Sequence, residues 1–422
     1  MTTIRAFDGY LVNSNRLEKV VSPAYDSLSA MERHAFCLAH PDNYINAMRS
    51  ADEYSEGERP TQAEVLRINA AHIKKMLAQG DFDKLDQPSL FIYRLAVGDH
   101  QQTAVICEIP IDHYDNGEVL RHENTRSDKE DLLAGYLEVV GASSSPVCLA
   151  YRENKEIDQL IESVSQSPPL FRFSAHDAVQ QTLWQVADEA LIGEFTGLFS
   201  GVSKTYLTDG HHRFAAGSRF AAKRRREYPD HGKEEHFNYM LVALFQSDQL
   251  RILPYNRCVK DLNGMTTEQF LSALSDSFLV RSCDAVEAEP TKLHDFGMCL
   301  EGEWYSLTLK SAGGLEINPV EALDVSVVQN FILSRVLGIH DARSDPRLDY
   351  VAGDTGMEGL ERRCRNGWAV AFACYPTSVE ELMQVADLDE VMPPKSTYFD
   401  PKMRSGIFLR LYGSGCRERA VG

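Results

Sequence analysis

Thr205-Tyr206-Leu207-Thr208-Asp209-Gly210-His211-His212-Arg213-Phe214-Ala215-Ala216-Gly217 is the stretch around which the predicted fold is built. Its apolar start predicts a short strand, Asp209-Gly210 predicts a tight turn, and the residues from His211 onward predict a helix. The first backbone N–H groups of a helix lack partners within the helix and lie at the positive end of its dipole. The turn is therefore either an anion site or a plain structural turn, in which Asp209 caps the helix and Gly210 supplies a permissive backbone.

The charged side chains of this stretch add chemistry to the turn. Arg213 carries a planar guanidinium whose geometry suits phosphate or carboxylate oxygens. His211 and His212 can exchange protons near neutral pH. We therefore take His211, His212 and Asp209 as candidate catalytic residues, and Gly210 and Arg213 as candidate phosphate-binding residues.

The composition is that of an ordinary globular protein, with 422 residues of which 43% are hydrophobic and 25% charged. A formal net charge of −19 disfavours nucleic acid and anionic membranes as partners. The sequence has no apolar run of about 18 residues, and residues 1–8 lack the pattern of a signal peptide. Nine cysteines without a CxxC pair favour reduced thiols and a cytoplasmic protein over disulfides or structural zinc.

A second polar cluster, Arg121-His122-Glu123-Asn124-Thr125-Arg126, precedes a predicted helix. The motif Ser127-Asp128-Lys129-Glu130 predicts a capping box that opens this helix at 131–140. Arginines beside a His-Glu pair suit anion binding combined with acid–base chemistry, although a solvated loop explains the same residues. The candidates are Glu123 for catalysis, and Arg121, His122 and Thr125 for phosphate binding.

Two smaller groups of polar residues follow predicted buried segments. Asp26 lies shortly after Pro23 and before a predicted helix, where it either caps the helix or contributes a carboxylate to the site. Asn256 and Arg257 close an apolar strand, where they either line a cleft or form a surface turn. We include Asp26 among the catalytic candidates, and Asn256 and Arg257 among the binding candidates.

The last cluster lies in the proline-rich stretch 392–402. It presents Lys395, Ser396, Thr397 and Lys402 within a few residues. Lysine beside hydroxyl groups is suited to phosphate oxygens, and a stiff surface loop is the alternative. These four residues complete the set of candidate phosphate-binding residues.

Three segments, 121–126, 209–213 and 395–402, each place basic residues beside hydroxyl or carboxylate groups. If they converge, they form a site for phosphate with an acid–base catalyst. A Mg²⁺ ion that bridges phosphates needs only one or two protein carboxylates, for which Asp209 and Glu123 are candidates. The chain lacks the HExxH, P-loop, GxGxxG and GxSxG motifs that indicate other chemistries.

The hydrophobic pattern predicts an α/β fold with mixed sheets. Helices are expected at 29–38, 61–79, 131–140, 156–164, 211–226, 267–279, 322–337 and 379–387. Strands are expected at 90–95, 103–109, 146–151, 182–186, 205–208, 239–245, 250–257, 298–300, 304–309 and 368–374. We expect a core at 1–258 that carries the turn, a smaller α/β insertion at 259–320, and a C-terminal segment at 321–422 that returns to the site through 392–402.

The chain resembles the family called domain of unknown function 1015 over nearly its whole length. The resemblance rests on Pro23-Ala24-Tyr25-Asp26, Arg121-His122-Glu123-Asn124-Thr125, Ser145-Pro146-Val147, Asp209-Gly210-His211-His212-Arg213, Leu253-Pro254-Tyr255-Asn256-Arg257 and Met392-Pro393-Pro394-Lys395-Ser396-Thr397-Tyr398-Phe399. The family often has proline at the position of Ala24 and tyrosine at that of Phe214. The tyrosine hydroxyl matters only if it contacts the ligand.

The Asp-Gly-His-His-Arg turn is also similar to the motif of the ParB and sulfiredoxin superfamily, which includes a kinase of free serine. This similarity implies a ParB/sulfiredoxin-like core, with ATP or ADP as the nucleotide and Mg²⁺ as a metal to be tested. Arg213 and the N–H groups of residues 210–212 would hold phosphate, while Arg121, Lys395 and Lys402 neutralise charge. The hydroxyl proton would pass to one of four side chains: His211, His212, Asp26 or Glu123.

The resemblance implies phosphoryl transfer on a small hydroxy amino acid such as free serine. Two alternatives use the same phosphate site: a phosphatase acting on phosphoserine or a related ester, and a nucleotide-gated binding or regulatory module without catalysis. Members of the family are often encoded beside enzymes of serine biosynthesis, which favours an enzyme. The oligomeric state, including a homo-oligomer, is left open by the sequence.

Overall fold

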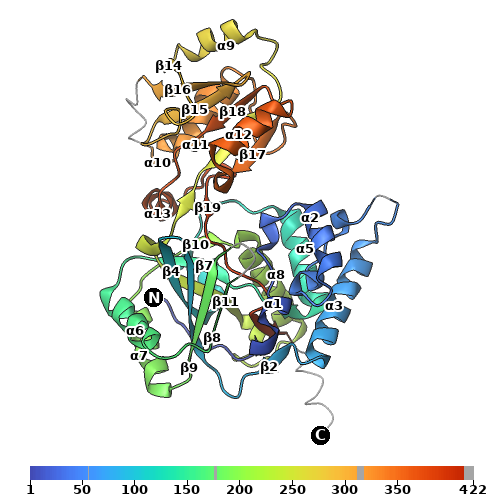
Figure 1. Cartoon of the computed structure of the whole chain (residues 1–422). Helices are drawn as coiled ribbons and strands as arrows, with labels where there is room; N and C mark the ends of the chain where they lie inside the picture. The colour runs from blue at the N-terminus through green and yellow to red at the C-terminus, as the bar shows by residue number, and fades with distance from the viewer. Residues whose placement is uncertain (56, 175–177, 311–317, 413–422) are drawn as a thin grey trace. The chain divides into compact units, whose positions relative to one another are not determined.

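The computed structural model describes residues 1–55, 57–174, 178–310 and 318–412 (Figure 1). The chain forms two compact units, the first made of residues 1–249 with the C-terminal residues from 401 onward, and the second of residues 250–400. These bounds differ from the predicted segments. The strand Tyr255–Val259, which was predicted to end the core, pairs only with strands of the second unit among the described residues.

The described helices of the first unit are α1 (Leu17–Val20), α2 (Ala30–Ala39), α3 (Gln62–Ala78), α4 (Asp112–Asp115), α5 (Ser127–Val140), α6 (Lys155–Ser165), α7 (Glu189–Ser200) and α8 (His211–Glu227). Its strands are β1 (Tyr10–Val12), β2 (Phe82–Lys84), β3 (Leu90–Val97), β4 (His100–Pro110), β5 (Val119–Leu120), β6 (Ala142–Ser143), β7 (Val147–Tyr151), β8 (Phe171–Ser174), β9 (Gln180–Val186), β10 (Thr205–Asp209), β11 (Tyr239–Gln246) and β20 (Phe408–Leu411).

The described helices of the second unit are α9 (Thr267–Leu274), α10 (Pro319–Ala322), α11 (Asp324–Val327), the π-helix Val328–Ser334, α12 (Gly356–Arg365) and α13 (Val379–Asp387). Its strands are β12 (Ile252–Leu253), β13 (Tyr255–Val259), β14 (Phe278–Cys283), β15 (Asp295–Leu300), β16 (Glu303–Leu309), β17 (Leu348–Ala352), β18 (Val370–Ala373) and β19 (Tyr398–Phe399). Sheets of mixed direction with packed helices confirm the predicted α/β class.

An eight-stranded sheet forms the centre of the first unit, in the order β5-β10-β7-β11-β4-β3-β9-β8. Strands β3 and β4, which correspond to the strands predicted at 90–95 and 103–109, form an antiparallel hairpin. Strand β11 is parallel to β7, and β10 is parallel to β5. Because β10 runs antiparallel to β7, its last residue, Asp209, lies opposite Cys148 near the start of β7.

One face of this sheet forms the main core of the first unit. Alternate residues of the strands point to it, such as Val147 and Leu149 of β7 and Val242 of β11. They pack against Phe195 of α7 and Phe214 of α8. Figure 1 shows α6 and α7 side by side beside the sheet, while α8 packs against α5. Helix α8 is therefore held by its apolar face, with its first turn at the edge of the core.

The opposite face of the sheet is covered by a four-stranded sheet in the order β2-β1-β20-β6. The ring of Phe408 in β20 lies 5.3 Å from that of Phe91 in β3. Glu108 of β4 is completely buried there and pairs with Arg5 at 2.6 Å and with Arg410 at 2.9 Å. The C-terminal segment from residue 401 is thus an integral part of the first unit.

The second unit is built on a six-stranded sheet in the order β14-β16-β15-β18-β13-β17. One face packs against α9 and the π-helix, with Phe270 and Ile332 in the core. The other face packs against α12 through Leu360. Strands β12 and β19 pair as a separate two-stranded ribbon.

Several predicted elements of the second unit are wrong in their bounds. The helix predicted at 267–279 ends at Leu274, and the chain continues as β14 from Phe278. The helix predicted at 322–337 is present as α11 and the π-helix at 324–334, and it begins later than predicted because Leu323 is extended. Pro254, which has no N–H group to donate to a ladder, separates β12 from β13 within the strand predicted at 250–257.

Candidate functional site

The predicted strand, turn and helix at 205–217 are confirmed as β10, Gly210 and α8. Gly210 is the residue that caps the helix, with φ 96° and ψ 28°, a conformation that favours glycine. It provides no side-chain acceptor of its own for the first N–H groups of α8. The N-cap position is therefore held by Gly210 and not by Asp209.

Arg213 fixes the shape of the turn. Its guanidinium donates hydrogen bonds to the carbonyl oxygens of Ser145 at 3.0 Å and Pro146 at 2.7 Å, and to the carboxylate of Asp209 at 2.6 Å. A Cβ atom added at Gly210 would lie 2.9 Å from the same guanidinium. Arg213 thus ties the start of α8 to the loop before β7, which makes it a positioning residue of the turn.

The carboxylate of Asp209 also faces a lysine from the far end of the chain. The Nζ atom of Lys402 lies 4.0 Å from Asp209 Oδ1 and contacts the carboxylate of Asp26. The side chain of Lys402 is 15% exposed, whereas that of Asp26 is 59% exposed. Three candidate residues from distant segments are therefore brought together at the end of β10: Asp26, Asp209 and Lys402.

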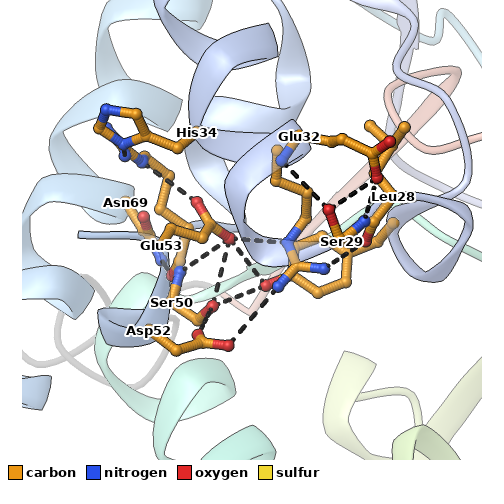
Figure 2. Close-up of polar contacts among 11 residues, drawn as sticks. Leu28, Ser29, Glu32, His34, Ser50, Asp52, Glu53 and Asn69 are labelled. Atoms are coloured by element: carbon orange, nitrogen blue, oxygen red, sulfur yellow. Dashed lines mark hydrogen bonds and ion pairs between the residues drawn. The ribbon is translucent and has the colours of Figure 1, made fainter. Parts of the chain in front are cut away.

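The segment that carries Asp26 is anchored by a buried carboxylate, Glu53. The hydroxyl of Tyr25 donates a hydrogen bond to Glu53 at 2.9 Å, and the guanidinium of Arg33 lies over the Tyr25 ring and binds Glu53 at 3.0 Å. Figure 2 shows Glu53 and Ser50 at the centre of this set of contacts. Because Tyr25 directly precedes Asp26, these contacts with Glu53 hold the backbone at Asp26, which is a catalytic candidate.

Sequence reasoning missed Glu53, which was not among the predicted site residues. Its side chain is completely buried, and a second arginine, Arg49, also binds it, at 3.3 Å. Paired arginines allow a carboxylate to be buried. The arginines at positions 33 and 49 were the available signal in the sequence, but no local pattern shows which acidic residue they bind.

The segment from 401 to 407 is held by hydrogen bonds to two other loops of the first unit. Ser22 N–H donates to the carbonyl oxygen of Ser405 at 2.9 Å. Gly406 N–H donates to Ser144 Oγ at 2.6 Å, and the hydroxyls of Ser145 and Ser405 are in contact. These bonds fix the position of Lys402 relative to the turn.

A cavity of about 490 Å³ lies beside the residues that flank Asp26. It is lined in part by Ser22, Pro23 and Ser27, and by Arg404, whose side chain is almost fully buried. This volume is within the usual range for small-molecule sites. Arg404 was not among the predicted site residues, and its place beside the cavity follows from long-range packing.

A second group, the His122–Glu123–His211 cluster, lies at the start of α8. The two imidazole rings meet edge to face, with their centroids 4.5 Å apart, and Nδ1 of His211 is 4.0 Å from the Glu123 carboxylate. Burial lowers the pKa of His122 to about 4 and, together with the nearby His122 ring, lowers that of His211 well below its usual range. Both rings are therefore neutral at pH 7.

The remaining candidates of this region make local contacts. His212 Nε2 accepts a hydrogen bond from the N–H of Arg126 at 3.1 Å, so this nitrogen is unprotonated, and burial lowers the pKa of the ring. Thr125 donates to Glu130, and Arg121 lies over the ring of Tyr114. The predicted capping box at 127–130 is wrong, because α5 already begins at residue 127 and has no side-chain cap.

The other predicted residues lie in the second unit. Asn256 and Arg257 are buried, and they bind the N–H of Cys374 at 3.1 Å and the carbonyl oxygen of Lys395 at 3.1 Å. Ser396 donates to the Pro393 carbonyl oxygen at 2.6 Å. Through these contacts, Asn256, Arg257 and Ser396 hold neighbouring parts of the second unit in place. Phosphate binding by Asn256, Arg257, Lys395, Ser396 and Thr397 stays a prediction.

Among the described residues, no helix has the length and apolar character required to cross a bilayer.

No curated protein matches the sequence. The sequence model of the family described as "Protein of unknown function (DUF1015)" matches residues 4–326. The similarity of the turn to the ParB and sulfiredoxin motif stays a prediction.

Several solved structures resemble the fold at low identity. One is a mutant free serine kinase in complex with AMP, with 14% identity, a TM-score of 0.36, and coverage of 70% of this chain and 87% of that chain. Another is a conserved hypothetical protein from Pyrococcus furiosus, with 12% identity, a TM-score of 0.36, and coverage of 73% and 95%. A third is SbnI with C-terminal truncation from Staphylococcus aureus, with 12% identity, a TM-score of 0.37, and coverage of 72% and 85%.

Proposed function

The chain belongs to the family described as "Protein of unknown function (DUF1015)", and from the site in its first unit we propose that it is a phosphoryl-transfer enzyme. The donor is a nucleotide, ATP or ADP, and the acceptor is the hydroxyl group of a small amino acid such as free serine. The observation that carries the proposal is the contact of Lys402 with Asp26, beside Asp209 at the turn before α8.

Phosphoryl transfer depends mainly on positioning and on neutralisation of charge. The N–H groups at the start of α8 and the ammonium group of Lys402 supply positive charge at the same place. Arg213 and Asp209 keep the turn in shape. A transferred phosphoryl group in front of Gly210 would interact with both the helix start and Lys402.

Asp26 is better placed as a proton acceptor than either of the two histidines. Its carboxylate is more than half exposed and contacts Lys402, which would also contact the phosphoryl group. His211 is buried against His122, and His212 already accepts a hydrogen bond from Arg126. A carboxylate beside a lysine is therefore favoured over either histidine as the general base.

The cavity lined in part by Pro23 and Ser27, which flank Asp26 in the chain, suits a small amino acid. Arg404 lines it with a buried guanidinium, which favours a carboxylate as its ligand. The substrate hydroxyl would then point toward Asp26. Its oxygen forms a bond to the terminal phosphorus of the nucleotide, the bond from that phosphorus to the bridging oxygen breaks, and the hydroxyl proton passes to Asp26.

A Mg²⁺ ion would neutralise charge on the nucleotide phosphates when bound. Asp209 is the predicted ligand, but its carboxylate oxygens face Arg213 at 2.6 Å and Lys402 at 4.0 Å. It would have to exchange one of these cations for the metal. In the proposed reaction, Mg²⁺ takes no part in bond formation, bond breaking or proton transfer.

The proposal is tested by incubating the full chain with serine and either ATP or ADP and following phosphoserine by ³¹P NMR. We expect phosphoserine with wild type, and a loss of about 100-fold or more in D26N, the usual scale of general-base catalysis. Lys75→Met, which removes an exposed lysine that pairs with Asp42 at 3.2 Å, is the control and should keep full activity. Phosphate release from phosphoserine without nucleotide would indicate a phosphatase, and nucleotide binding without turnover of any hydroxy amino acid would indicate a regulator.

A further inference from the structure

We infer that the His122–Glu123–His211 cluster binds a divalent transition-metal ion of the Zn²⁺ class. Each of the three residues offers one ligand atom, and these atoms all lie within 4.8 Å of one another. The inference rests on these three side chains and does not depend on the proposed phosphoryl transfer.

The two histidines lie close enough to act together. Metals bind neutral imidazole through either ring nitrogen, and the rings of His122 and His211 have their centroids 4.5 Å apart.

His211 provides a second, independent observation. Its side chain is 5% exposed, and its Nε2 atom is buried without a hydrogen-bond partner among the residues that the structure describes. A buried polar atom in this state costs free energy unless something binds it. A metal bound at Nε2 would satisfy this atom.

The donor set selects the class of metal. Two imidazoles and one carboxylate match the three protein ligands of catalytic zinc sites and of non-haem iron sites, which keep a position open for water or substrate. Mg²⁺ and Ca²⁺ prefer oxygen ligands throughout. The cluster is thus distinct in chemistry from a Mg²⁺ site at Asp209.

The three residues come from elements that the fold holds rigidly. His211 begins α8, whose Phe214 stacks on Tyr114 with ring centroids 4.9 Å apart. His122 and Glu123 follow β5, which pairs in parallel with β10, the strand that leads into α8. The ligands therefore need little rearrangement to bind a metal.

Nearby charge affects how tightly the metal is held. Arg121 and Arg213 both act on His211 as positive charges, and they would oppose an added cation. Glu123 is the only carboxylate in the cluster, so its negative charge should be decisive for binding. This makes Glu123→Gln the most informative variant, and its side chain, 39% exposed, is the least buried of the three.

The test uses the full chain stripped of metal with a chelator and then titrated with Zn²⁺ in a calorimeter, and with Co²⁺ while its visible absorption is recorded. We expect one equivalent to bind. Loss of even an outer partner of a metal ligand typically weakens binding by about 10–100-fold, so E123Q and H211N should each weaken it at least about tenfold. Circular dichroism checks that both variants fold.

The matched control is Glu118→Gln. Glu118 lies 3.2 Å from Nε2 of His113, a carboxylate–imidazole pair without a second histidine. E118Q should bind Zn²⁺ as wild type does. The inference is overturned if folded wild type binds neither ion, if folded E123Q keeps wild-type affinity, or if E118Q weakens binding as much as E123Q.

Discussion

The ammonium group of Lys402 contacts the carboxylate of Asp26, although 376 positions separate these residues in the chain. Asp209 is the next carboxylate from the same ammonium group, at 4.0 Å. The C-terminal segment therefore completes the site at the turn before α8. The carboxylate of Asp26 is partly exposed, and the side chain of Lys402 is mostly buried. A phosphorylated ligand can therefore compete with Asp26 for the ammonium group of Lys402.

Loss of this pair should affect activity far more than stability. Asp26 is 59% exposed, and exposed ion pairs contribute about 0–1 kcal/mol. We expect D26N to change the free energy of unfolding in urea by less than about 1 kcal/mol. A larger loss of stability would mean that the pair serves the fold, and that a fall in activity could not be assigned to catalysis.

Gly210→Ala should destabilise the protein by about 1–2 kcal/mol, since its φ of 96° is unfavourable for a residue with a Cβ. The new Cβ would also press on the Arg213 guanidinium at 2.9 Å. The control is Gly193→Ala within α7, where a Cβ would meet nothing within 4 Å and should stabilise by up to about 1 kcal/mol. Equal thermal midpoints for the two variants would contradict the role given to the turn.

Glu53→Gln should reduce the free energy of unfolding by about 3 kcal/mol or more, the usual cost of breaking a buried ion pair. It leaves Arg33 and Arg49 facing a neutral amide. Activity should also fall, because one of the two Glu53 oxygens that accept from Tyr25, Arg33 and Arg49 is replaced by a donor, which weakens the contacts that position the neighbouring Asp26. Glu32→Gln, at an exposed capping carboxylate of α2, should have a much smaller effect on both measurements. A stable and fully active E53Q would refute the anchoring role.

Asp324 should make the second unit less stable as the pH rises. Burial raises the pKa of this carboxyl from 3.8 to about 6, against the opposing effect of His294, whose Nδ1 lies 3.0 Å away. The folded state therefore binds the proton more tightly than the unfolded state. The stabilisation is complete below about pH 4 and is lost as the pH passes 6.

The measurement is urea unfolding of wild type and D324N at several pH values. The advantage of wild type over D324N should shrink by up to about 3 kcal/mol between pH 4 and pH 7, at about 1.4 kcal/mol per pKa unit. A difference that stays constant with pH would show that Asp324 has the same pKa in both states.

Local signals in the sequence were sufficient for much of the fold. The turn at 209–210 and the strands β3 and β4 depend on glycine and on apolar residues within short stretches, and they were predicted. The helix predicted at 322–337 was right in its interior, but apolar periodicity did not show that the extended Leu323 delays its start to residue 324. The capping box at 127–130 failed because the same residues also fit the first turn of α5.

The site could be predicted only in part, because its contacts are long-range. Asp26, Asp209 and Lys402 were chosen for their chemistry, but nothing near them in the sequence indicates that they meet. Glu53 and Arg404 were missed because a buried charged residue has the same local appearance as an exposed one. Their roles depend on partners and on a cavity that only the folded chain defines.

The most direct test of the central claim is the rate of phosphoserine formation from serine and ATP or ADP by wild type, D26N and K402M, with K75M as the control. We predict turnover by wild type and K75M, and a loss of at least about 100-fold in D26N and K402M while both remain folded. Wild-type rates in folded D26N and K402M would contradict the claim that Lys402 and Asp26 form the catalytic site.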